Sequence, residues 1–442
     1  MGPSDKQSRP SSIYRDLDNR EVNLGERFLE LPMSKPGLNR SNENVYQGLR
    51  VRTIVNASGP STRLSGGIMR PEVAEAMAEA SQMCVDLAEL QGRASEILAE
   101  VTGADAGYVT AGASAALMLA SAACLAGLDP ARMNRLPDTT GMANEVVMAR
   151  SQRNMYDRAV AQAGAKLVEV GIPDRFSGAG VRDAQVWEFE AAIGDKTAAI
   201  LWVAQPHSEP ALTEIVTLAR RHGIPVIVDA AGQLPPAENL KRFIAEGADL
   251  VAFSGGKAIG GPQASGILAG RRDLIQSAAL QQLDHDTYFE QWSPPASLFD
   301  KNALVGLPAS GIGRAAKCGK EEIVGLLTAL KLFLAEDCEE RHQRRLAICQ
   351  EIVDGLKSVE GATVTLVDRK DGRGPTVEVA VHANELDFSA GDLVKRLQDG
   401  EPSVHANHTR VRNGIVVFGP TCMKHGDAAI VIRRVRAELG AE

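Results

Sequence analysis

The sequence predicts an α/β protein with a seven-stranded, mainly parallel sheet and a small α+β domain at its carboxyl end. Short runs rich in Val, Ile and Leu alternate with longer amphipathic or alanine-rich stretches through the central part of the chain. Near-continuous apolar runs are typical of strands that are covered on both faces. Helical stretches between such strands indicate parallel crossover connections.

Seven apolar runs make up the predicted sheet. They are Gly107–Thr110, Glu145–Met148, Lys166–Val170, Ala198–Val203, Pro225–Val228, Leu250–Phe253 and Gly266–Ala269. Helical spacing predicts helices between most of them, for example Ser114–Leu125 and Leu212–His222. Two more helices are predicted before the first strand, at 71–80 and 94–101.

The pattern changes after Gly319. A long helical stretch is predicted from Lys320 to about Ser358. It is followed by alternating, strand-like segments at 363–367, 376–381 and 414–418, with helices near 388–398 and 426–438. Alternation indicates a sheet with one solvated face, which is typical of an α+β domain. The expected organisation is a polar amino-terminal extension or arm (1–50), a large α/β domain (51–319), and a linking helix with the small domain (320–442).

Composition and charge favour a partner that is a small molecule. The 442-residue chain has a net charge of −8 and a pI near 5.6, so it lacks the overall basic character of a nucleic-acid binder. The longest apolar run, Ala115–Gly127, is too short to span a bilayer. The six cysteines have no CxxC spacing, which predicts neither a zinc site nor a disulfide framework. We therefore expect a cytoplasmic protein.

Lys257 stands in a turn rich in Ser and Gly that follows a predicted buried strand. The segment reads Asp249-Leu-Val-Ala-Phe-Ser-Gly-Gly-Lys-Ala-Ile-Gly-Gly-Pro-Gln263. A lysine held in such a turn can lose its charge and act as an amine in Schiff-base chemistry. A solvent-exposed loop lysine would give the same letters, so this window alone leaves both interpretations open.

Two other segments suggest what Lys257 works with. Asp229 closes the apolar run Val226–Val228, and a carboxylate buried there needs a cationic partner such as a protonated pyridine nitrogen. The alternative is an aspartate that caps the next helix. The turn Gly112-Ala113-Ser114 precedes an alanine-rich stretch, where free N–H groups and the Ser114 hydroxyl would bind a phosphate. An ordinary serine cap is the alternative here.

These features form an ordered set. The phosphate turn, the aspartate and the lysine each stand at the carboxyl end of a predicted strand, which is the edge where open α/β sheets bind their ligands. The three features in this order are a far more specific signal of a cofactor site than any one of them alone. It predicts a site for pyridoxal 5′-phosphate (PLP) in the large domain.

Six segments carry a resemblance to a known family. They begin Val55-Asn-Ala-Ser-Gly-Pro, Pro71-Glu-Val-Ala-Glu-Ala-Met, Tyr108-Val-Thr-Ala-Gly-Ala-Ser-Ala-Ala, Val228-Asp-Ala-Ala, Ser254-Gly-Gly-Lys-Ala-Ile-Gly-Gly-Pro-Gln and Gly311-Ile-Gly-Arg-Ala-Ala-Lys-Cys-Gly-Lys-Glu-Glu-Ile. The chain resembles, over about residues 46–440, the selenocysteine synthase-like and D-glucosaminate-6-phosphate ammonia-lyase-like group of fold-type I PLP-dependent enzymes. The lyase-like branch is the closer one.

The resemblance implies a homo-oligomer with shared active sites. It also implies that Lys257 binds PLP as a Schiff base, that Asp229 contacts the pyridine nitrogen, and that Gly112, Ala113 and Ser114 lie near the phosphate. Ser254, in the lysine segment, is expected beside the cofactor as well.

Gln152 departs from the family pattern. In Arg150-Ser-Gln-Arg-Asn-Met-Tyr-Asp157 it occupies the position where relatives generally carry a histidine that is expected against the cofactor ring. Glutamine is neither an acid nor a base near neutral pH, which argues against a mechanism that needs an imidazole stacked on the ring. His207 is a candidate to supply an imidazole nearby, and a loop histidine without a catalytic part is the alternative.

Four basic residues are candidates for substrate binding. Arg314 and Lys317 stand in a glycine-punctuated segment, and the resemblance places such residues near the active site. Arg63 and Arg70 are expected to reach the site from the same subunit or an adjoining one. Arginine can bind a carboxylate or phosphate through two parallel hydrogen bonds. Exposure to solvent is the alternative for Lys317. His405 and His408 lack a third ligand, so no metal is expected.

These inferences predict a PLP-dependent ammonia-lyase. A small hydroxylated amino acid, with or without a phosphate group, would lose its Cα proton and a β-substituent and yield a 2-keto acid and ammonia. Loss of the same proton also permits a racemase or an aminotransferase, and the same cofactor permits an aldolase. A tRNA-dependent selenium transferase would need a basic RNA-binding domain, which residues 1–45 do not resemble. A catalytically silent PLP-binding protein is a further alternative.

Overall fold

The computed structural model describes residues 44–172, 183–368 and 374–440. The chain divides after Ile54 into two units. In the first, the short helix α2 (Val45–Gly48) begins at Asn44, whose side chain accepts hydrogen bonds from the backbone N–H groups of the first turn. Most of the expected amino-terminal extension lies outside the described residues, so the predicted domain boundaries stay predictions.

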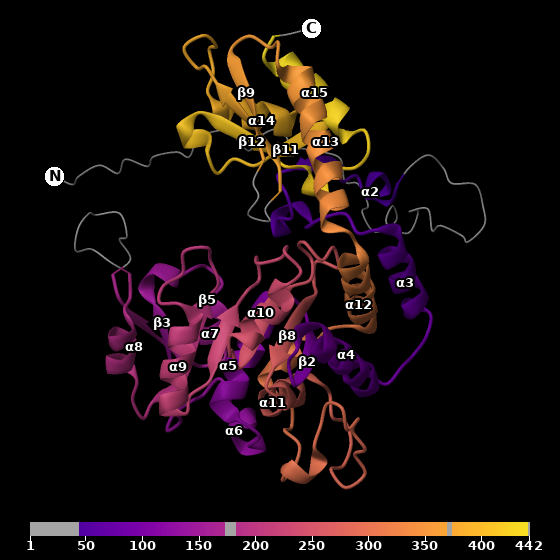
Figure 1. Ribbon diagram of the computed structural model, residues 1–442. Helices are drawn as coiled ribbons and strands as arrows, with labels where there is room; N and C mark the ends of the chain where they lie inside the picture. Colours follow the sequence, from indigo (N-terminus) through magenta and orange to yellow (C-terminus); the bar gives the residue numbers. More distant parts are fainter. Residues whose placement is uncertain (1–43, 173–182, 369–373, 441–442) are drawn as a thin grey trace, which may run out of the picture. The chain divides into compact units, whose positions relative to one another are not determined.

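The second unit contains a seven-stranded sheet (Figure 1). Its strands, in spatial order, are β2 (Ala106–Thr110), β8 (Gly266–Gly270), β7 (Leu250–Ser254), β6 (Val226–Asp229), β5 (Thr197–Val203), β3 (Glu145–Ala149) and β4 (Lys166–Val170). The pairs from β7 through β6, β5 and β3 to β4 are parallel. Only β8 is antiparallel, to both β2 and β7. The predicted mainly parallel sheet is confirmed.

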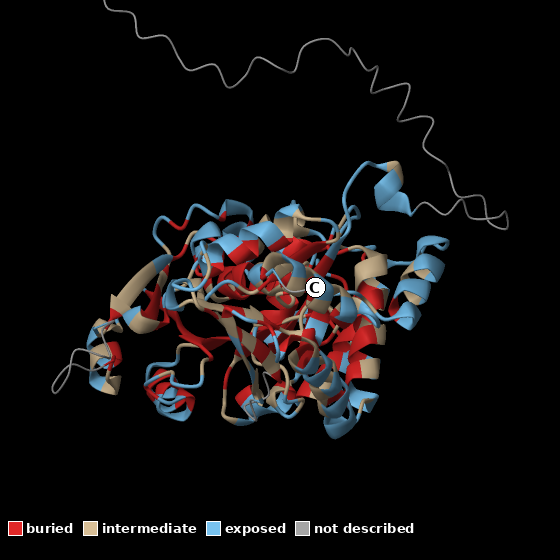
Figure 2. Ribbon diagram, turned by 90° about the horizontal axis from the view of Figure 1, so that it is seen from above, coloured by how far each residue is buried: buried red, intermediate tan, exposed pale blue. Residues whose placement is uncertain are grey.

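Helices cover both faces of this sheet because side chains alternate between the faces along each strand. One face packs against α5 (Ala113–Ala126), α6 (Pro130–Arg135), α7 (Arg158–Gln162) and α11 (Arg272–Gln282). The other packs against α3 (Pro71–Ser81), α4 (Leu87–Thr102), α8 (Val186–Ala192), α9 (Leu212–His222), α10 (Asn239–Ala245) and α12 (Lys320–Ala335). Buried residues accordingly concentrate between the outer helices (Figure 2).

The prediction of one continuous helix from Lys320 to Ser358 is wrong. The structure has α12, ending at Ala335, and α13 (Cys338–Leu356). Asp337 separates them, because its side chain accepts hydrogen bonds from the N–H groups of Glu339 and Glu340 and so begins a new helix. The junction contains neither glycine nor proline, so no strong helix-breaking residue marks it in the sequence.

The carboxyl-terminal part of the second unit has its own core. Strands β9 (Ala362–Val367), β10 (Thr376–Val381) and β12 (Ile415–Phe418) form an antiparallel sheet in the order β12-β10-β9. One face packs with α13, α14 (Ala390–Asp399) and α15 (Asp427–Glu438). The three predicted strands and two predicted helices are confirmed. A further pair, β1 (Ile54–Ala57) with β11 (Ser403–Ala406), was not expected.

Candidate active site

A cavity of about 790 Å³ lies at the carboxyl ends of the parallel strands. Most of its lining comes from the carboxyl ends of β2, β3, β5, β6 and β7 and the segments that follow them. Six of the residues expected at the cofactor line it: Gly112, Ala113, Ser114, Asp229, Ser254 and Lys257. The three sequence features that stood far apart in the chain therefore meet in one cavity.

Helix α5 presents unpaired backbone N–H groups to this cavity. Its N-cap is Gly112, with φ +111° and ψ 164°, and no side chain caps the helix. Backbone with this combination of angles is essentially restricted to glycine. Because Gly112, Ala113 and Ser114 line the cavity, the positive end of this 14-residue helix is available to a phosphate.

Asp229 ends β6 and is 8% exposed. Its Oδ1 accepts a hydrogen bond from the N–H of Ala231 at 3.1 Å. Burial raises the pKa of this carboxyl, although the Ala231 hydrogen bond and the charge of Lys257 act in the opposite direction. No ion pair holds Asp229 in the part of the chain that the structure describes. A buried carboxylate in this state fits a cationic ligand atom.

Lys257 is placed by a turn that only glycines can form. A Cβ at Gly255 would lie 2.3 Å from the Ser265 hydroxyl, and one at Gly256 would lie 2.7 Å from the Cα of Gln263. The Gly255 N–H donates to the Ser265 carbonyl at 2.9 Å. The turn is consequently packed against the start of β8, and half-buried Lys257 lies in the cavity wall.

Gln152 is buried but does not line the cavity. Its Oε1 accepts a hydrogen bond from the N–H of Val203 at 2.8 Å, and its Nε2 donates to the carbonyl of Glu209 at 3.3 Å. Both amide ends are thus used to hold the end of β5 and the loop after it. Direct contact of Gln152 with the cofactor stays a prediction.

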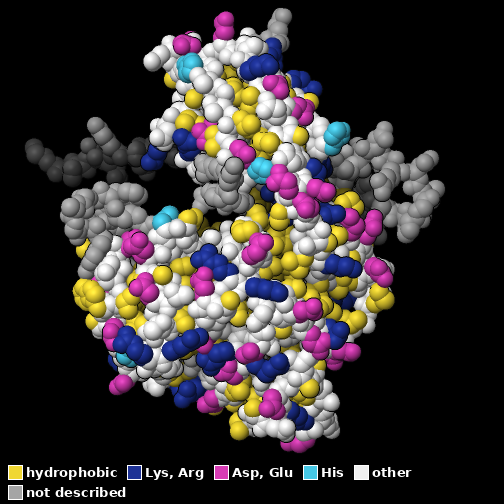
Figure 3. All heavy atoms as spheres, viewed as in Figure 1, with side chains coloured by type: hydrophobic (Ala, Val, Ile, Leu, Met, Phe, Trp, Pro, Cys, Tyr) yellow, Lys and Arg dark blue, Asp and Glu magenta, His cyan; other side chains and the backbone are white. Residues whose placement is uncertain are grey.

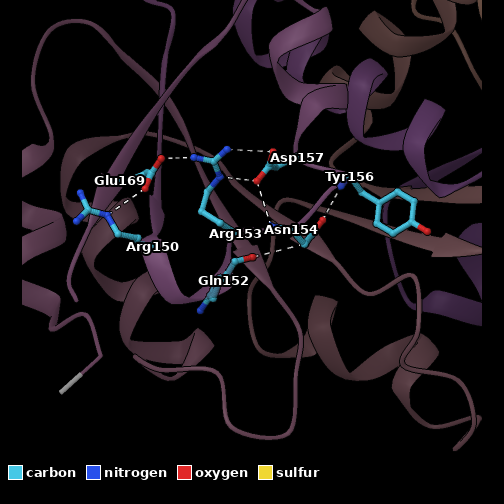
Figure 4. A network of polar contacts seen from close by, with 7 residues as sticks. All are labelled: Arg150, Gln152, Arg153, Asn154, Tyr156, Asp157 and Glu169. Carbon is cyan, nitrogen blue, oxygen red and sulfur yellow. Dashed lines mark hydrogen bonds and ion pairs between the residues drawn. The ribbon is translucent and has the colours of Figure 1, made fainter. Parts of the chain in front are cut away.

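The segment around Gln152 is fixed by a polar network (Figure 4). Arg153 pairs with Asp157 and with Glu169, and Arg150 pairs with Glu169 at 3.0 Å. Asn154 accepts a hydrogen bond from the N–H of Tyr156 at 2.8 Å. Since Asn154 and Tyr156 line the cavity, the network positions two site residues that were not predicted, although both stand in the segment from Arg150 to Asp157.

The remaining predicted site residues lie outside the cavity lining. His207 is exposed in the turn after β5. Arg314 pairs with Asp284 at 2.9 Å, and Arg70 pairs with Glu72 at 3.3 Å. Lys317 and Arg63 are exposed, and Arg63 follows Thr62, which does line the cavity. Their roles stay predictions.

Six lining residues that were not predicted carry neutral polar side chains. They are Thr62, Asn154, Tyr156, Gln205, Gln233 and Gln263. Gln233 donates from Nε2 to the carbonyl of Ala204 at 2.6 Å, which ties the loops after β6 and β5 together. Single amides in loops give no recognisable spacing, so only the fold could reveal them. Within the described ranges, no group of three or more His, Cys, Asp or Glu could hold a metal.

Comparison with known proteins identifies the family. The family model of L-seryl-tRNA selenium transferase matches residues 62–287. The D-glucosaminate-6-phosphate ammonia lyase of Salmonella typhimurium is 31% identical over 406 residues, which cover 89% of this chain and 97% of the relative. The chain belongs to the selenium transferase family. The predicted group, on its lyase-like side, is confirmed.

Two further likenesses bear on the fold and the chemistry. The 5′-C-glycyluridine monooxygenase-decarboxylase of a Streptomyces species is 31% identical over 405 residues, covering 89% of this chain and 92% of the relative. A solved structure of D-glucosaminate-6-phosphate ammonia-lyase matches with a TM-score of 0.74 and 30% identity, over 90% of this chain and 99% of that chain. This family member is a fold-type I, PLP-dependent enzyme.

The residues of the cavity fit PLP. The free amino end of α5 suits its phosphate, the buried Asp229 carboxyl suits a protonated pyridine nitrogen, and Lys257 supplies a primary amine for its aldehyde. PLP, when bound, withdraws electrons from the Cα of an attached amino acid, which weakens the bonds to that carbon.

In the described part of the chain no helix is long and apolar enough to cross a membrane.

Proposed function

We propose that this enzyme is an ammonia-lyase that acts on a small hydroxylated amino acid bearing a phosphate group. The observation that carries the proposal is the match to D-glucosaminate-6-phosphate ammonia lyase over 97% of the relative's length. It is supported by a cavity whose lining fits PLP. The products would be a 2-keto acid and ammonia.

Each charged residue of the cavity has a proposed task. Lys257 removes the Cα proton with its Nζ once a substrate has displaced it, and it holds that proton for delivery to the leaving hydroxyl. Asp229 keeps a proton on the pyridine nitrogen, because a carboxylate buried beside that atom stabilises its charged form. Loss of water from the β-carbon then leaves a product that hydrolyses to the 2-keto acid and ammonia.

The neutral polar lining suits the hydroxyl groups of such a substrate. Gln205, Asn154 and Ser254 offer both donors and acceptors at the cavity wall. A volume of about 790 Å³ accommodates a cofactor with a small substrate. The reaction does not need an imidazole at position 152, since the proposed proton carrier is Lys257.

The negative groups of the substrate need cations that this lining does not contain. Among the residues described at the cavity wall, Lys257 is the only basic one. We infer that the cytoplasmic enzyme is a homo-oligomer in which Arg63 or Arg70 of an adjoining subunit completes the site. Two observations support this: Arg63 is exposed beside the lining residue Thr62, and Tyr156 is 52% exposed at the cavity although it is a large ring.

A second candidate function is oxidative decarboxylation of an amino acid. It is favoured by one observation, that the Streptomyces monooxygenase-decarboxylase has the same 31% identity over nearly the same length. Racemisation, aldol cleavage and transamination use the same cofactor and residues. Transfer of selenium to a tRNA is disfavoured, because on the face drawn in Figure 3 the basic side chains are interspersed with acidic ones.

The test is a substrate panel with the PLP-loaded enzyme. Hydroxylated amino acids, each with and without a terminal phosphate, are assayed for ammonia and 2-keto acid, with the Lys257→Ala enzyme as the control. We expect both products from a phosphorylated member and none from the control. Exchange of Cα hydrogen with solvent deuterium without ammonia would instead identify a racemase. Carbon dioxide release that requires oxygen would identify a decarboxylating monooxygenase.

A further inference from the structure

The second unit contains another cavity, of about 540 Å³. It is lined by the first turns of α13, by Pro235 and Pro236 of the loop after β6, and by Asp368 and Gly374. It shares no lining residue with the cavity around Lys257. Nothing in the proposed reaction uses it.

Two arginines of α13 give this cavity its chemical character. Arg341 and Arg345 are four residues apart and therefore lie on the same face of the helix. Arg341 pairs with Glu336 at 3.2 Å. Glu336 also pairs with Arg344, so one carboxylate already serves two guanidinium groups.

Arg345 has no ion-pair partner among the described residues. No ion pair or hydrogen bond joins its side chain to any residue in the described ranges. The two acidic residues of the lining contact neighbouring lining residues and not Arg345. Asp368 pairs with His342 at 3.2 Å, and Glu339 accepts a hydrogen bond from Gln343 at 2.6 Å.

This arrangement disfavours the charged form of Arg345. Burial lowers the pKa of its guanidinium, and the nearby charge of Arg341 lowers it further, while Glu336 acts in the opposite direction. Two cations that share a cavity repel each other, and both lose hydration there. An oxyanion placed between them would offset both penalties.

We propose that this cavity binds a small phosphate monoester through Arg341 and Arg345. A phosphate monoester carries nearly two negative charges near neutral pH and offers three acceptor oxygens, which match two guanidinium forks. The volume of about 540 Å³ exceeds the need of a bare phosphate and lies in the range of small-molecule sites. This binding site is independent of the reaction proposed for Lys257.

Cys338 provides a local reporter of occupancy. It lines the cavity and is exposed, and its sulfur accepts a hydrogen bond from Arg341 at 3.3 Å. Cys84 is exposed elsewhere in the chain and serves as an internal reference. The experiment measures the alkylation rate of each cysteine by N-ethylmaleimide in the PLP-loaded enzyme, with glycerol 3-phosphate as the probe and peptide mass spectrometry as the readout.

We expect the probe to slow alkylation of Cys338 and to leave Cys84 unchanged. When the probe concentration is about ten times its Kd, the rate at Cys338 should fall about tenfold, because the free fraction of sites falls as 1/(1 + [L]/Kd). Inorganic phosphate tests whether the phosphate group suffices without the organic part. Succinate tests the class of anion, and protection by succinate but by neither phosphate would overturn the proposal.

The variants separate this site from a general effect of charge. Arg345→Gln should abolish protection and Arg345→Lys should weaken it. Arg344→Gln makes the same charge change on the same helix at a residue outside the lining, and it should keep protection. Equal slowing of Cys338 and Cys84, or full protection in Arg345→Gln with an unchanged circular dichroism spectrum, contradicts the proposal. Loss of turnover has no part in this readout, so failure of the lyase assay leaves the result interpretable.

Discussion

At the scale of single residues, the site depends on polar side chains that lack a full set of hydrogen-bond or ion-pair partners. Asp229 is buried with one backbone hydrogen bond and no ion pair among the described residues. Gln152 shows the opposite condition, because both ends of its amide are occupied. The first arrangement leaves a carboxylate that a cationic ligand atom could neutralise, and the second uses the amide to hold two segments of the chain together.

Replacing Asp229 by Asn should stabilise the cofactor-free protein at neutral pH. The pKa of Asp229 is raised by burial above its ordinary 3.8, so its favourable contribution to folding is complete below the unfolded pKa and is lost as the pH rises through the folded pKa. Asparagine does not ionise, so the variant does not lose this contribution as the pH rises. The gain at pH 7 should be about 1.4 kcal/mol for each pKa unit of the rise, measured by urea denaturation between pH 4 and 8.

With PLP bound, the wild type should be more stable than the Asp229→Asn variant, because the charge of Asp229 then contacts a protonated nitrogen. The asparagine protein should gain less stability from PLP than the wild type does. An apo variant that becomes less stable than the wild type as the pH rises from 4 to 7 would show that burial does not dominate at Asp229.

Replacing Gln152 by Leu should lower the free energy of unfolding. The change leaves the Val203 N–H and the Glu209 carbonyl without their partner, which costs about 1–3 kcal/mol for a buried polar group. Gln152→Glu keeps an acceptor for Val203 and should cost less. Denaturation of the PLP-loaded proteins gives both values, and a leucine variant as stable as the wild type would refute the structural role.

The sequence alone could not separate these two conditions. Asp229 ended an apolar strand, so its burial followed from the pattern of its neighbours. Gln152 was expected against the cofactor because of its position in the motif, whereas its partners, Val203 and Glu209, stand far along the chain. Hydrogen bonds between distant loops leave no local signal.

At the scale of elements, the junction between a strand and a helix decides the chemistry. Helix α5 begins without a side-chain cap, so its first N–H groups stay available. Helix α13 begins with the cap of Asp337, which closes that end and separates it from α12. Small residues before an alanine-rich stretch predicted the first junction, whereas the second contains neither glycine nor proline to mark a break.

Gly112→Ala should weaken the binding of PLP. Its backbone angles are unfavourable for alanine by about 1–3 kcal/mol, so the first turn of α5 should shift and misplace the N–H groups. The Kd for PLP, measured by absorbance titration of the cofactor-free protein, should rise. Gly103→Ala is the matched control. It changes a left-handed glycine at the end of α4, outside the cavity lining, and should reduce stability without changing the Kd.

At the scale of the whole molecule, the sequence predicted more of the fold than of the site. Seven strands and their order along the chain followed from apolar runs, because a sheet buried on both faces requires them. The lining amides, such as Gln205 and Gln233, did not follow, since no periodicity marks them. The partners of charged residues did not follow either: Arg314 pairs with Asp284, 30 residues earlier in the chain, and its role in substrate binding stays a prediction.

A shared active site predicts complementation between two inactive variants. Lys257→Ala removes the catalytic amine, and Arg63→Ala removes the cation expected from the adjoining subunit. When both are co-expressed and form mixed dimers at random, about one quarter of the sites should be intact and activity should return to that level. Mixed oligomers without activity would exclude Arg63 as a residue shared between subunits.

The position of β8 also bears on when the enzyme can first hold its cofactor. Gly266 stands opposite both Thr110 and Ser254 in the sheet, and it allows β8 to approach the Gly112 turn closely because a Cβ there would lie 2.5 Å from the Gly112 carbonyl carbon. The phosphate turn and the lysine turn are therefore joined by a strand that is synthesised long after β2. A growing chain on the ribosome cannot assemble this edge until β8 has emerged, and such distant pairings form slowly. Capture of PLP should therefore mark a late step of folding.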